Sequence, residues 1–344
     1  MIAGAVMRFA IIGYGAIGEI HARVIEAIEG AELVAVATRN PEKQRQAAER
    51  HHCDVYADYR EMLRRDDIEV VAVCLPSGSH EEAATAVAEA GKHCIVEKPM
   101  EISVQRCTRI AELFDRKGLV ISVIFQHRFD ASTMLIKQAI DSGKMGKLNY
   151  GSARTIWFRD ENYYRHSGWR GTWAYDGGGA LMNQAIHTID LLQHLMGPVE
   201  AVCGKCATLY HQAMETEDLG IALLKFKSGA MGVIEGTTLA YPGFFTEVNV
   251  YGQEGSAGIR NDAVSFCNFS SGPDQQLQQL QETGDECIPY GWYNLVPHIR
   301  QYQDVMDAIA KKRAPLISGW EGMETVKIIE GIYRSSETED WIQL

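Results

Sequence analysis

A glycine-spaced turn between an apolar strand and a helix limits the fold of this 344-residue chain more than any other feature. Residues 9–12 are apolar, Gly13, Gly15 and Gly18 follow, and a helical pattern leads to a second apolar run at 31–37. This order matches the dinucleotide-binding fingerprint, in which the glycines permit a tight turn, close approach of a pyrophosphate and close helix packing. We therefore predict a doubly wound parallel α/β domain of the Rossmann type. The other residues of the turn assigned to the cofactor are Tyr14, Ala16 and Ile17.

The end of the second apolar run bears on which nicotinamide cofactor is bound. In NAD-binding folds a carboxylate here accepts a hydrogen bond from the ribose 2′-hydroxyl. This chain has Thr38 and Arg39 instead, followed by Asn40 and Pro41, which suit the start of a helix. Because a guanidinium can pair with a 2′-phosphate, we predict that Thr38 and Arg39 contact the cofactor and that NADP is preferred. NAD is the alternative, in which Arg39 stacks on the adenine or faces solvent.

The next buried strand ends in a loop that we also assign to the cofactor. Residues 69–75 are apolar and β-branched, as expected of a buried parallel strand. Such folds bind ligands in the loops at the carboxyl ends of their strands. His80 has a second interpretation, as a residue that caps the following helix. The residues assigned from this loop are Leu75, Pro76, Ser77 and His80.

A lysine follows the short strand at residues 93–96. Lys98 stands at the carboxyl end of this strand, so its side chain is predicted to enter the cofactor crevice. Pro99 fixes the backbone, and Glu97 could hold the ammonium by a charge-assisted hydrogen bond. We assign Glu97 and Lys98 to the cofactor site and Lys98 also to catalysis. An ordinary solvated lysine is the alternative.

A second polar constellation follows three glycines at residues 177–179. A helix is predicted to begin after them, and Asn183 and His187, four positions apart, share one face of it. Asp190 adjoins His187 and could orient its imidazole. We assign all three to catalysis, and Asn183 and His187 also to substrate binding. Taken by itself, the pattern fits a buried histidine satisfied by Asp190 better than a catalytic base.

After residue 147 the pattern changes to short strands separated by turns. This indicates an α+β domain with a mostly antiparallel, open sheet. We place a dinucleotide-binding domain at 7–126 and a substrate-binding and oligomerisation domain at 127–344. Two late helices, near 297–312 and 321–334, could return to pack on the first domain.

Two irregular segments of the second half receive different interpretations. The loop at 159–170 mixes polar and aromatic residues, as sugar sites do, and we assign Tyr163, Trp169 and Arg170 to the substrate. An ordinary surface loop is the alternative. The segment 268–286 is rich in Gln, Ser, Gly and Asp, and we expect a mobile excursion without a functional site.

The composition excludes several classes of function. A net charge of −12 disfavours a nucleic-acid partner. No apolar run is long enough to span a membrane, and residues 1–6 do not resemble a secretory signal. Eight scattered cysteines fit cytosolic thiols, so a cytoplasmic location is expected. Cys203 and Cys206 form a lone C-x-x-C without a second ligand pair, and we predict no metal.

Three motifs in order make the chain resemble the GFO/IDH/MocA oxidoreductases, the relatives of glucose–fructose oxidoreductase and inositol dehydrogenase. They are the glycine turn, the Glu97-Lys98-Pro99 motif and the stretch from Gly178 to Asp190. The resemblance also covers residues 126–129, 169–173 and 315–319. It implies that Lys98 is the catalytic-site lysine and His187 the catalytic histidine. It places Gln126 with the cofactor and Arg128 with the substrate.

One position departs from many members of this family. They carry Asp where this chain has Asn183, and an amide can hydrogen-bond a hydroxyl but cannot accept its proton. More of the proton transfer therefore falls to Lys98 and His187, which are expected to meet beside the nicotinamide. By analogy with the family, we also expect a homodimer or homotetramer formed through the open sheet.

The sequence thus predicts an NAD(P)-dependent dehydrogenase or reductase. It would transfer a hydride between nicotinamide and a hydroxyl or keto carbon of a sugar, an inositol-like polyol or a nucleotide sugar. Two alternatives are an NAD-assisted glycosidase, which would show no net cofactor turnover, and a non-catalytic cofactor-sensing protein.

Overall fold

The computed structural model describes residues 6–291 and 293–344, and the chain forms two compact units. Unit 1 takes the chain up to Gln126 together with Cys287–Met323, and unit 2 consists of His127–Glu286 and Glu324–Leu344. We expected that residues 1–6 do not form a secretory signal, and residues 1–5 of that segment lie outside the described residues. None of the helices in the described ranges combines the length and the apolar character needed to cross a bilayer.

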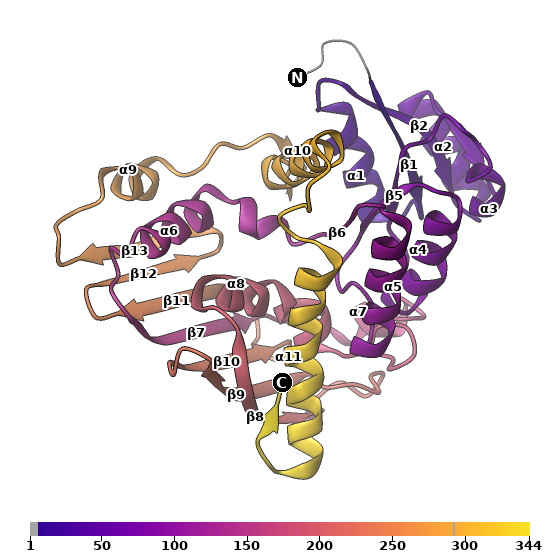
Figure 1. The fold of residues 1–344 in the computed structure, drawn as a ribbon. Helices are drawn as coiled ribbons and strands as arrows, with labels where there is room; N and C mark the ends of the chain where they lie inside the picture. Colours follow the sequence, from indigo (N-terminus) through magenta and orange to yellow (C-terminus); the bar gives the residue numbers. More distant parts are fainter. Residues whose placement is uncertain (1–5, 292) are drawn as a thin grey trace. The chain divides into compact units, whose positions relative to one another are not determined.

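Unit 1 contains a sheet of six parallel strands in the order β3-β2-β1-β4-β5-β6. This confirms the predicted doubly wound sheet, whose strand order is that of dinucleotide-binding folds. Figure 1 marks four of these strands, β1, β2, β5 and β6. The strands are β1 (Met7–Ile12), β2 (Ala31–Ala37), β3 (Asp54–Tyr56), β4 (Val70–Val73), β5 (His93–Val96) and β6 (Ile121–Val123). The helices are α1 (Ala16–Glu26), α2 (Pro41–His51), α3 (Tyr59–Met62), α4 (His80–Glu89), α5 (Val104–Lys117) and α10 (Val296–Lys311). Short elements are η1 (Ser77–Ser79), β14 (Pro289–Tyr290) and β15 (Tyr293–Asn294), and η2 (Gln126–Phe129) begins at the last residue of the first segment of unit 1 and continues into unit 2.

The central strands of unit 1 are apolar on both faces because helices cover both faces. Phe9 and Ile11 of β1 are fully buried, and so are all four residues of β4. Helix α10 packs beside α1 and places Tyr302 in the same core, with its ring 5.7 Å from that of Phe9. A late segment of the chain thus completes the core of the first unit.

Unit 2 is built on an eight-stranded sheet in the order β13-β12-β11-β7-β10-β9-β8-β16. Its pairs are antiparallel except that β7 and β10 run parallel, so the predicted mostly antiparallel sheet is confirmed. The strands are β7 (Leu148–Ile156), β8 (Val199–Ala207), β9 (Leu219–Phe226), β10 (Met231–Thr237), β11 (Phe245–Gly252), β12 (Gly255–Arg260), β13 (Ala263–Phe269) and β16 (Ile342–Gln343).

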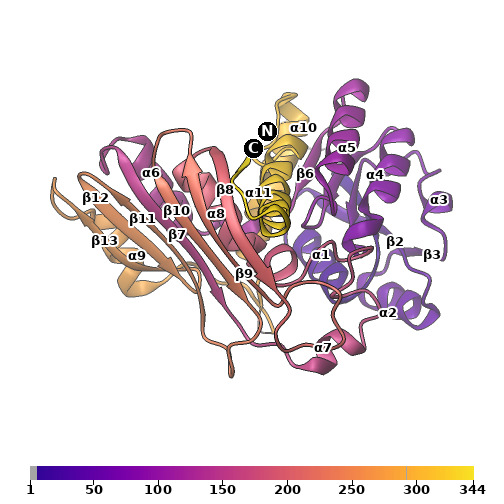
Figure 2. The ribbon, with the colours of Figure 1, turned by 90° about the horizontal axis from the view of Figure 1, so that it is seen from below.

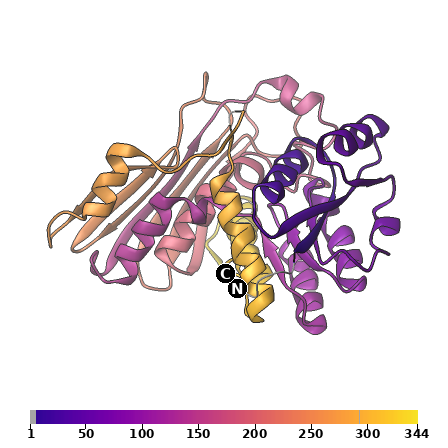
Figure 3. The ribbon, with the colours of Figure 1, turned by 90° about the horizontal axis from the view of Figure 1, so that it is seen from above.

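Helices cover one face of this sheet and leave the other open (Figures 2 and 3). Along β9, Leu224 and Phe226 are buried, whereas the alternate residues Ile221 and Leu223 are each 47% exposed. Alternation of this kind is expected of a strand with one covered face. The helical elements of unit 2 are α6 (Ala131–Asp141), α7 (Glu161–Arg165), the π-helix η3 (Ala180–Ala185), α8 (Ile186–Met196), α9 (Gln275–Thr283) and α11 (Gly319–Thr338), which begins in unit 1.

The prediction that residues 268–286 form a mobile excursion is wrong for most of the segment. Residues Gln275–Thr283 form helix α9, whose N-cap is Asp274. The Asp274 carboxylate accepts hydrogen bonds from the backbone N–H groups of Gln276 and Leu277, and Leu277 is buried. The polar composition concealed a capped helix that buries one leucine.

Candidate active site

The parallel strands of unit 1 bring the predicted cofactor residues to one edge of the sheet. Gly13 follows β1, Arg39 follows β2, Leu75 follows β4, Lys98 follows β5 and Gln126 follows β6. Because the strands are parallel, these loops all leave the sheet at its carboxyl edge. The strand order reverses between β1 and β4, and open α/β sheets bind their ligands beside such a reversal.

The turn after β1 has the geometry that its glycines predicted. Gly13 has φ +95°, and a Cβ there would lie 2.5 Å from the carbonyl oxygen of Cys74. A Cβ on Gly18 would overlap the carbonyl oxygen of Gly13. A Cβ on Gly15 would meet nothing within 4 Å, and Gly15 begins α1 without a side-chain cap. The open space and the uncapped helix end fit the pyrophosphate of a dinucleotide.

The residues between these glycines differ in exposure. Tyr14 is buried, and its hydroxyl lies 2.7 Å from Nε2 of His51. Burial raises the pKa of Tyr14 to about 12. Ala16 is exposed and Ile17 is half-buried in the first turn of α1. The ring of Tyr14 therefore supports the turn from inside, and the backbone of the turn is left to meet a cofactor.

The segment after β2 presents one exposed cation. Thr38 donates its backbone N–H to the carbonyl of Tyr56 at 2.9 Å, and its own carbonyl accepts from the Gln44 amide at 2.6 Å. Asn40 caps α2 by accepting hydrogen bonds from two backbone N–H groups, as predicted. Arg39 is exposed between these fixed residues. The site therefore offers a guanidinium where NAD-specific folds offer a carboxylate.

His80 neither reaches toward a cofactor nor caps helix α4, the two roles that the sequence suggested. Its side chain is fully buried, with Nε2 2.9 Å from the carbonyl oxygen of Leu75 and Nδ1 2.9 Å from that of Pro99. Both ring nitrogens thus face protein carbonyls, and the ring joins the loop after β4 to the loop after β5. We correct its assignment from cofactor contact to positioning of the loops beside Ser77, which is also buried, and Lys98.

Glu97 is buried beneath Lys98, and its carboxylate is shared between two donors. Oε2 accepts the backbone N–H of Lys98 at 3.0 Å, and Oε1 lies 3.0 Å from Nε2 of His21. Burial alone would raise the pKa of Glu97, but the hydrogen bond and charge of His21, with the charges of Lys98 and His298, lower it to about 2. Glu97 therefore carries a buried negative charge that fixes the backbone of Lys98.

Two neighbours of Glu97, His21 and His298, were missed by sequence reasoning. His21 is fully buried on α1, with Nδ1 2.5 Å from the Tyr302 hydroxyl, and His298 lies edge-on to it at 5.7 Å between ring centroids. His21, Glu97 and His298 place potential ligand atoms within 4.8 Å of one another. Only the position of His21, three residues after Gly18, could have marked it in the sequence.

The glycines of unit 2 allow close packing at the start of the predicted helix. A Cβ on Gly179 would overlap the carbonyl oxygen of Glu217, and one on Gly178 would overlap the Tyr333 hydroxyl. The Glu217 carboxylate accepts the backbone N–H groups of Gly179 at 3.0 Å and Leu181 at 2.8 Å. A buried glutamate thus anchors the first turn, which is the π-helix η3.

Asn183 and His187 are half-buried and lie on one face of a stretch that is otherwise buried. Within residues 176–192, all of them described, they are the two side chains that are not buried. The amide of Asn183 donates to the Asp176 carboxylate at 2.5 Å, and its carbonyl accepts from Gln184 at 2.7 Å. The structure therefore brings both residues to one face, as their spacing predicted.

A second histidine, which the sequence did not single out, lies beside His187. The rings of His127 and His187 meet edge-on with their centroids 5.0 Å apart. Nδ1 of His127 lies 2.7 Å from Asp130 and 3.2 Å from Asp262. Burial would lower the pKa of His127, but Asp262 and Asp130 outweigh it and raise the pKa to about 9. At neutral pH His187 therefore has a cationic neighbour.

Asp190 and Arg128 form a buried pair, which changes the assignment of both. The Asp190 carboxylate accepts Arg128 Nε at 2.8 Å and the adjacent terminal nitrogen at 2.7 Å, and it also accepts Thr325 Oγ1 at 3.1 Å. Both side chains of the pair are 1% exposed. We therefore revise Asp190 from orienting the imidazole of His187 to holding Arg128. Arg128, in turn, is too deeply buried for the predicted substrate contact.

The three remaining candidate substrate residues lie together in unit 2. Arg170 stacks on Tyr163 at 4.5 Å and on Trp169 at 5.0 Å, measured from the guanidinium carbon to each ring centroid. The Tyr163 hydroxyl accepts from the Gln184 amide at 3.1 Å. The side chain of Gln184 therefore links this loop to the helix that carries Asn183. Gln126, in unit 1, is buried and its amide donates to the Tyr293 hydroxyl at 3.5 Å.

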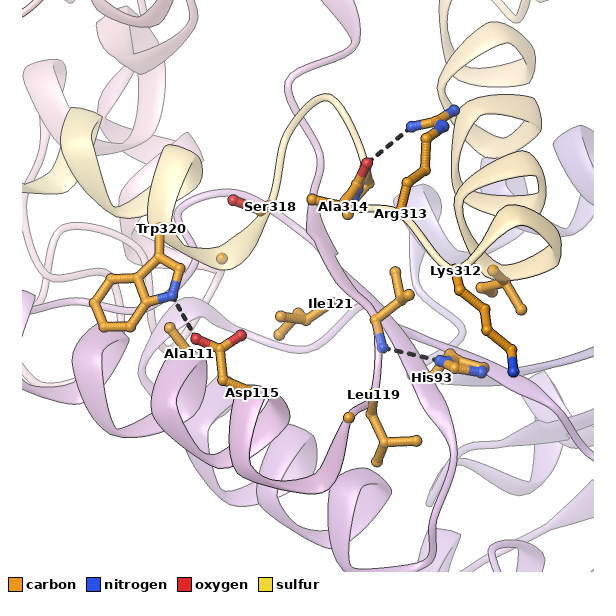
Figure 4. A pocket seen from close by; sticks show the side chains of 15 residues that line it. His93, Ala111, Asp115, Leu119, Ile121, Lys312, Arg313, Ala314, Ser318 and Trp320 are labelled. Atoms are coloured by element: carbon orange, nitrogen blue, oxygen red, sulfur yellow. Dashed lines mark hydrogen bonds between the residues drawn. The ribbon is translucent and has the colours of Figure 1, made fainter.

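A pocket of about 700 Å³ in unit 1 lies away from this chemistry (Figure 4). It opens at the amino ends of β5 and β6, where His93 Nδ1 accepts the backbone N–H of Val120 at 2.9 Å. Trp320 lines the same pocket and donates its indole N–H to Asp115 at 2.8 Å. This is the sheet edge opposite Gly13 and Lys98, so the pocket is not the predicted cofactor site.

The structure places the C-x-x-C pair on one strand of unit 2. Cys203 and Cys206 are free thiols on β8, three residues apart along one strand. Burial raises the pKa of Cys206 far above its usual value, which keeps the thiol protonated and unreactive.

Comparison with known proteins agrees with this fold and these motifs. Residues 7–125 match the family described as "Oxidoreductase family, NAD-binding Rossmann fold", and residues 133–258 match the GFO/IDH/MocA C-terminal domain. The chain is 29% identical to the myo-inositol 2-dehydrogenase of Thermotoga maritima, over 98% of each chain.

Two solved structures are also similar over nearly the whole chain. The WlbA dehydrogenase of Bordetella pertussis, in complex with NADH and UDP-GlcNAcA, is 31% identical over 99% of both chains, with a TM-score of 0.87. The Chromobacterium violaceum WlbA dehydrogenase, in complex with the same two ligands, is 29% identical over 100% of this chain and 97% of that one, with a TM-score of 0.90.

The fold and the glycine turn define an NAD-binding oxidoreductase with a Rossmann domain. The chain belongs to the GFO/IDH/MocA family, and the predicted resemblance is confirmed. It is a dehydrogenase of the class that acts on CH–OH groups.

Proposed function

We propose that this enzyme transfers a hydride between a nicotinamide cofactor and a hydroxyl-bearing carbon of a sugar, an inositol-like polyol or a nucleotide sugar. The observation that carries the proposal is that Asn183 and His187, both half-buried, lie on one face of the otherwise buried stretch 176–192. A base and an amide on one face suit a substrate that presents neighbouring hydroxyls. The Thermotoga inositol dehydrogenase and the two WlbA dehydrogenases support this substrate class.

The chain's own residues would divide the work as follows. A dinucleotide held through its pyrophosphate at the turn Gly13–Gly18 would supply the nicotinamide that accepts or returns the hydride. His187 takes the hydroxyl proton on oxidation and returns it on reduction, and Asn183 holds a neighbouring hydroxyl. Lys98 stabilises the negative charge that develops on the reacting oxygen. Glu97 keeps Lys98 in place through its backbone. Unit 1 is thus the cofactor unit and unit 2 supplies the substrate residues.

We further propose that NADP is preferred over NAD. The exposed guanidinium of Arg39 stands where a carboxylate would favour the ribose hydroxyl of NAD. NADH in the two WlbA complexes favours the opposite preference. The ratio of kcat/KM for the two cofactors with one substrate decides between them.

The decisive experiment compares Lys98→Met and His187→Ala with the unchanged enzyme on a panel of sugars and inositols. With NAD(P)H or NAD(P)+ at saturating concentration, each variant should lose about 100-fold or more in the rate of hydride transfer. Asp141→Asn, an exposed change on α6, serves as the control. Near-normal transfer in both active-site variants would contradict the assignment, and activity without net cofactor turnover would favour the glycosidase instead.

Two further proposals concern the state of the protein. Exposed Ile221, Leu223 and Met231 on the open sheet face support a homo-oligomer formed through that face. Sedimentation velocity would give the size of the oligomer, and Leu223→Asp should dissociate it.

The eight free thiols support a cytoplasmic location.

A further inference from the structure

Two arginines of unit 2 flank a single tyrosine ring in the segment that follows β7. The guanidinium carbon of Arg159 lies 5.2 Å from the ring centroid of Tyr163, and that of Arg170 lies 4.5 Å from it. Arg159 also stacks on Trp157 at 4.9 Å, and Arg170 on Trp169 at 5.0 Å. Aromatic faces hold a guanidinium flat and leave the donors on its edge available.

Neither guanidinium is neutralised by the protein. In the described ranges, no carboxylate lies within 4.0 Å of Arg159 or Arg170, whereas Arg165 of the same loop pairs with Glu161 at 3.5 Å. Both arginines are half-buried, so water screens their charges only in part. Nε of Arg159 is buried without a hydrogen-bond partner. Two partly desolvated positive charges are thus concentrated in one place.

The acidic residues of this region are engaged elsewhere. Asp160 caps α7 by accepting the backbone N–H of Tyr163 at 2.9 Å. Glu161 accepts the backbone N–H of Ala213 at 2.8 Å. Asp176 accepts that of Gly171 at 2.8 Å, besides the amide of Asn183. Because these carboxylates satisfy backbone donors, no carboxylate in the described part of the chain neutralises the positive charge of the arginine pair, and that charge remains available to a bound anion.

Hydrogen bonds connect the arginine pair to Asn183, one of the two half-buried residues of the stretch 176–192. A terminal nitrogen of Arg159 donates to the Gln184 carbonyl at 2.8 Å, and the Gln184 amide donates to Asn183 at 2.7 Å and to Tyr163 at 3.1 Å. One amide side chain therefore separates the two positive charges from Asn183. A sugar whose hydroxyl meets Asn183 and His187 could place a substituent beside both arginines.

We propose that the substrate carries an anionic group, a carboxylate or a phosphate, and that Arg159 and Arg170 bind it. The inference rests on the proposed dehydrogenase function and narrows its substrate class to anionic sugars. Planar guanidinium groups bind such anions through paired N–H donors, and the aromatic rings of Trp157, Tyr163 and Trp169 preorganise them. A sugar acid would present the carboxylate, and a nucleotide sugar would present the phosphate.

The test uses the full-length enzyme with three probes that share one sugar ring: glucose, glucuronate and UDP-glucose. We expect kcat/KM to be about 10- to 100-fold higher for at least one anionic probe than for glucose. Preference for glucuronate identifies the carboxylate as the recognised group, and preference for UDP-glucose identifies the phosphate. Equal or better turnover of glucose overturns the inference while leaving the proposed function intact.

Variants assign the effect to the two arginines. Arg170→Gln, which leaves the Gln184 hydrogen bonds in place, should lower the ratio of kcat/KM for the anionic probe to kcat/KM for glucose about 10- to 100-fold, through a higher KM for the anionic probe. Arg159→Gln should lower the same ratio, and Arg165→Gln, the matched control in the same loop, should leave it unchanged. An equal loss on charged and neutral probes would show a merely structural role and reject the inference.

Calorimetry keeps the two proposals separable. Enzyme loaded with NADPH should bind glucuronate or UDP-glucose, and Arg170→Gln should weaken that binding about 10-fold or more. Arg170-dependent binding without hydride transfer to any probe would reject the proposed function and retain the anion site. Binding that ignores Arg170 would reject the anion site itself.

Discussion

Gly15 and Gly18 stand three residues apart in the same turn, yet alanine should affect them in different ways. A Cβ on Gly15 meets nothing within 4 Å, and its φ of −83° and ψ of −163° are open to alanine. A Cβ on Gly18 overlaps the carbonyl oxygen of Gly13, which is backbone and cannot turn aside. The structure therefore predicts that Gly15→Ala harms the ligand site alone and that Gly18→Ala harms the fold.

The magnitudes follow from these contacts. At Gly15 the methyl group restricts the unfolded chain and slightly weakens the start of α1, effects of opposite sign below about 1 kcal/mol each. At Gly18 the overlap requires a backbone shift that costs about 1–3 kcal/mol. With a melting shift of about 2–4 °C for each kcal/mol, Gly18→Ala should melt about 2–12 °C lower. Gly15→Ala should melt within about 4 °C of the parent and bind NADPH about 10-fold or more weakly, since the methyl fills the space left for the pyrophosphate.

Differential scanning calorimetry of the cofactor-free proteins and fluorescence titration with NADPH measure the two quantities separately. Cofactor must be absent from the melting scans because a bound ligand stabilises the folded state by itself. The reasoning is refuted if Gly15→Ala binds NADPH like the parent, or if Gly18→Ala melts like the parent. Either result would mean that the turn adapts, and that the open space over Gly15 is not where the dinucleotide lies.

Three further outcomes are expected. Arg39→Asp should move the NADP-to-NAD ratio of kcat/KM about 10-fold or more toward NAD, and an unchanged ratio would remove Arg39 from cofactor selection. Asp190→Asn should lower the free energy of unfolding in urea by about 3–5 kcal/mol, because it leaves the buried charge of Arg128 without this partner. Glu200→Gln, in an exposed ion pair, should cost less than about 1 kcal/mol, and equal losses would contradict the argument. His127 has a pKa raised to about 9, above the usual 6.5, so its stabilisation is complete below pH 6.5 and is lost as the pH rises through 9; the stability difference between the parent and His127→Asn should shrink over that range, and a constant difference would contradict it.

The fold could be predicted because its signals are local and agree with one another. Gly13, Gly15 and Gly18 fix a turn, and the apolar runs on either side have the lengths of buried strands. The Gln-rich helix α9 was not predicted, because the polar composition of the segment indicates disorder more strongly than one N-cap and one leucine indicate a helix. Asp274 has the residue type of an N-cap, but a short glutamine-rich helix is stable only when it packs on the rest of the protein.

The site could be predicted only in part, because a sequence reveals spacing but not burial. The four-residue spacing of Asn183 and His187 specified a common face, and that part of the prediction holds. The partners of Asp190 lie 62 and 135 residues away along the chain, so its pairing with Arg128 and Thr325 left no local signal. The sequence therefore indicates His187, three residues from Asp190, as its partner in place of the distant residues.

The two units anchor their proposed reactive residues in the same physical way. In unit 1 a buried glutamate, Glu97, accepts the backbone N–H of Lys98, and in unit 2 a buried glutamate, Glu217, accepts the N–H groups of Gly179 and Leu181 ahead of His187. The two glutamates differ in their pKa. Burial would raise the pKa of Glu97, but His21 outweighs it and lowers the pKa to about 2. Burial raises the pKa of Glu217 to about 7, and the hydrogen bonds that Glu217 accepts offset this only in part. The anchor of Lys98 therefore remains anionic across the working pH range, while the anchor of the His187 helix loses its charge in mild acid. In both units the buried carboxylate acts on the backbone, so the group that positions the segment is separate from the side chain proposed to react.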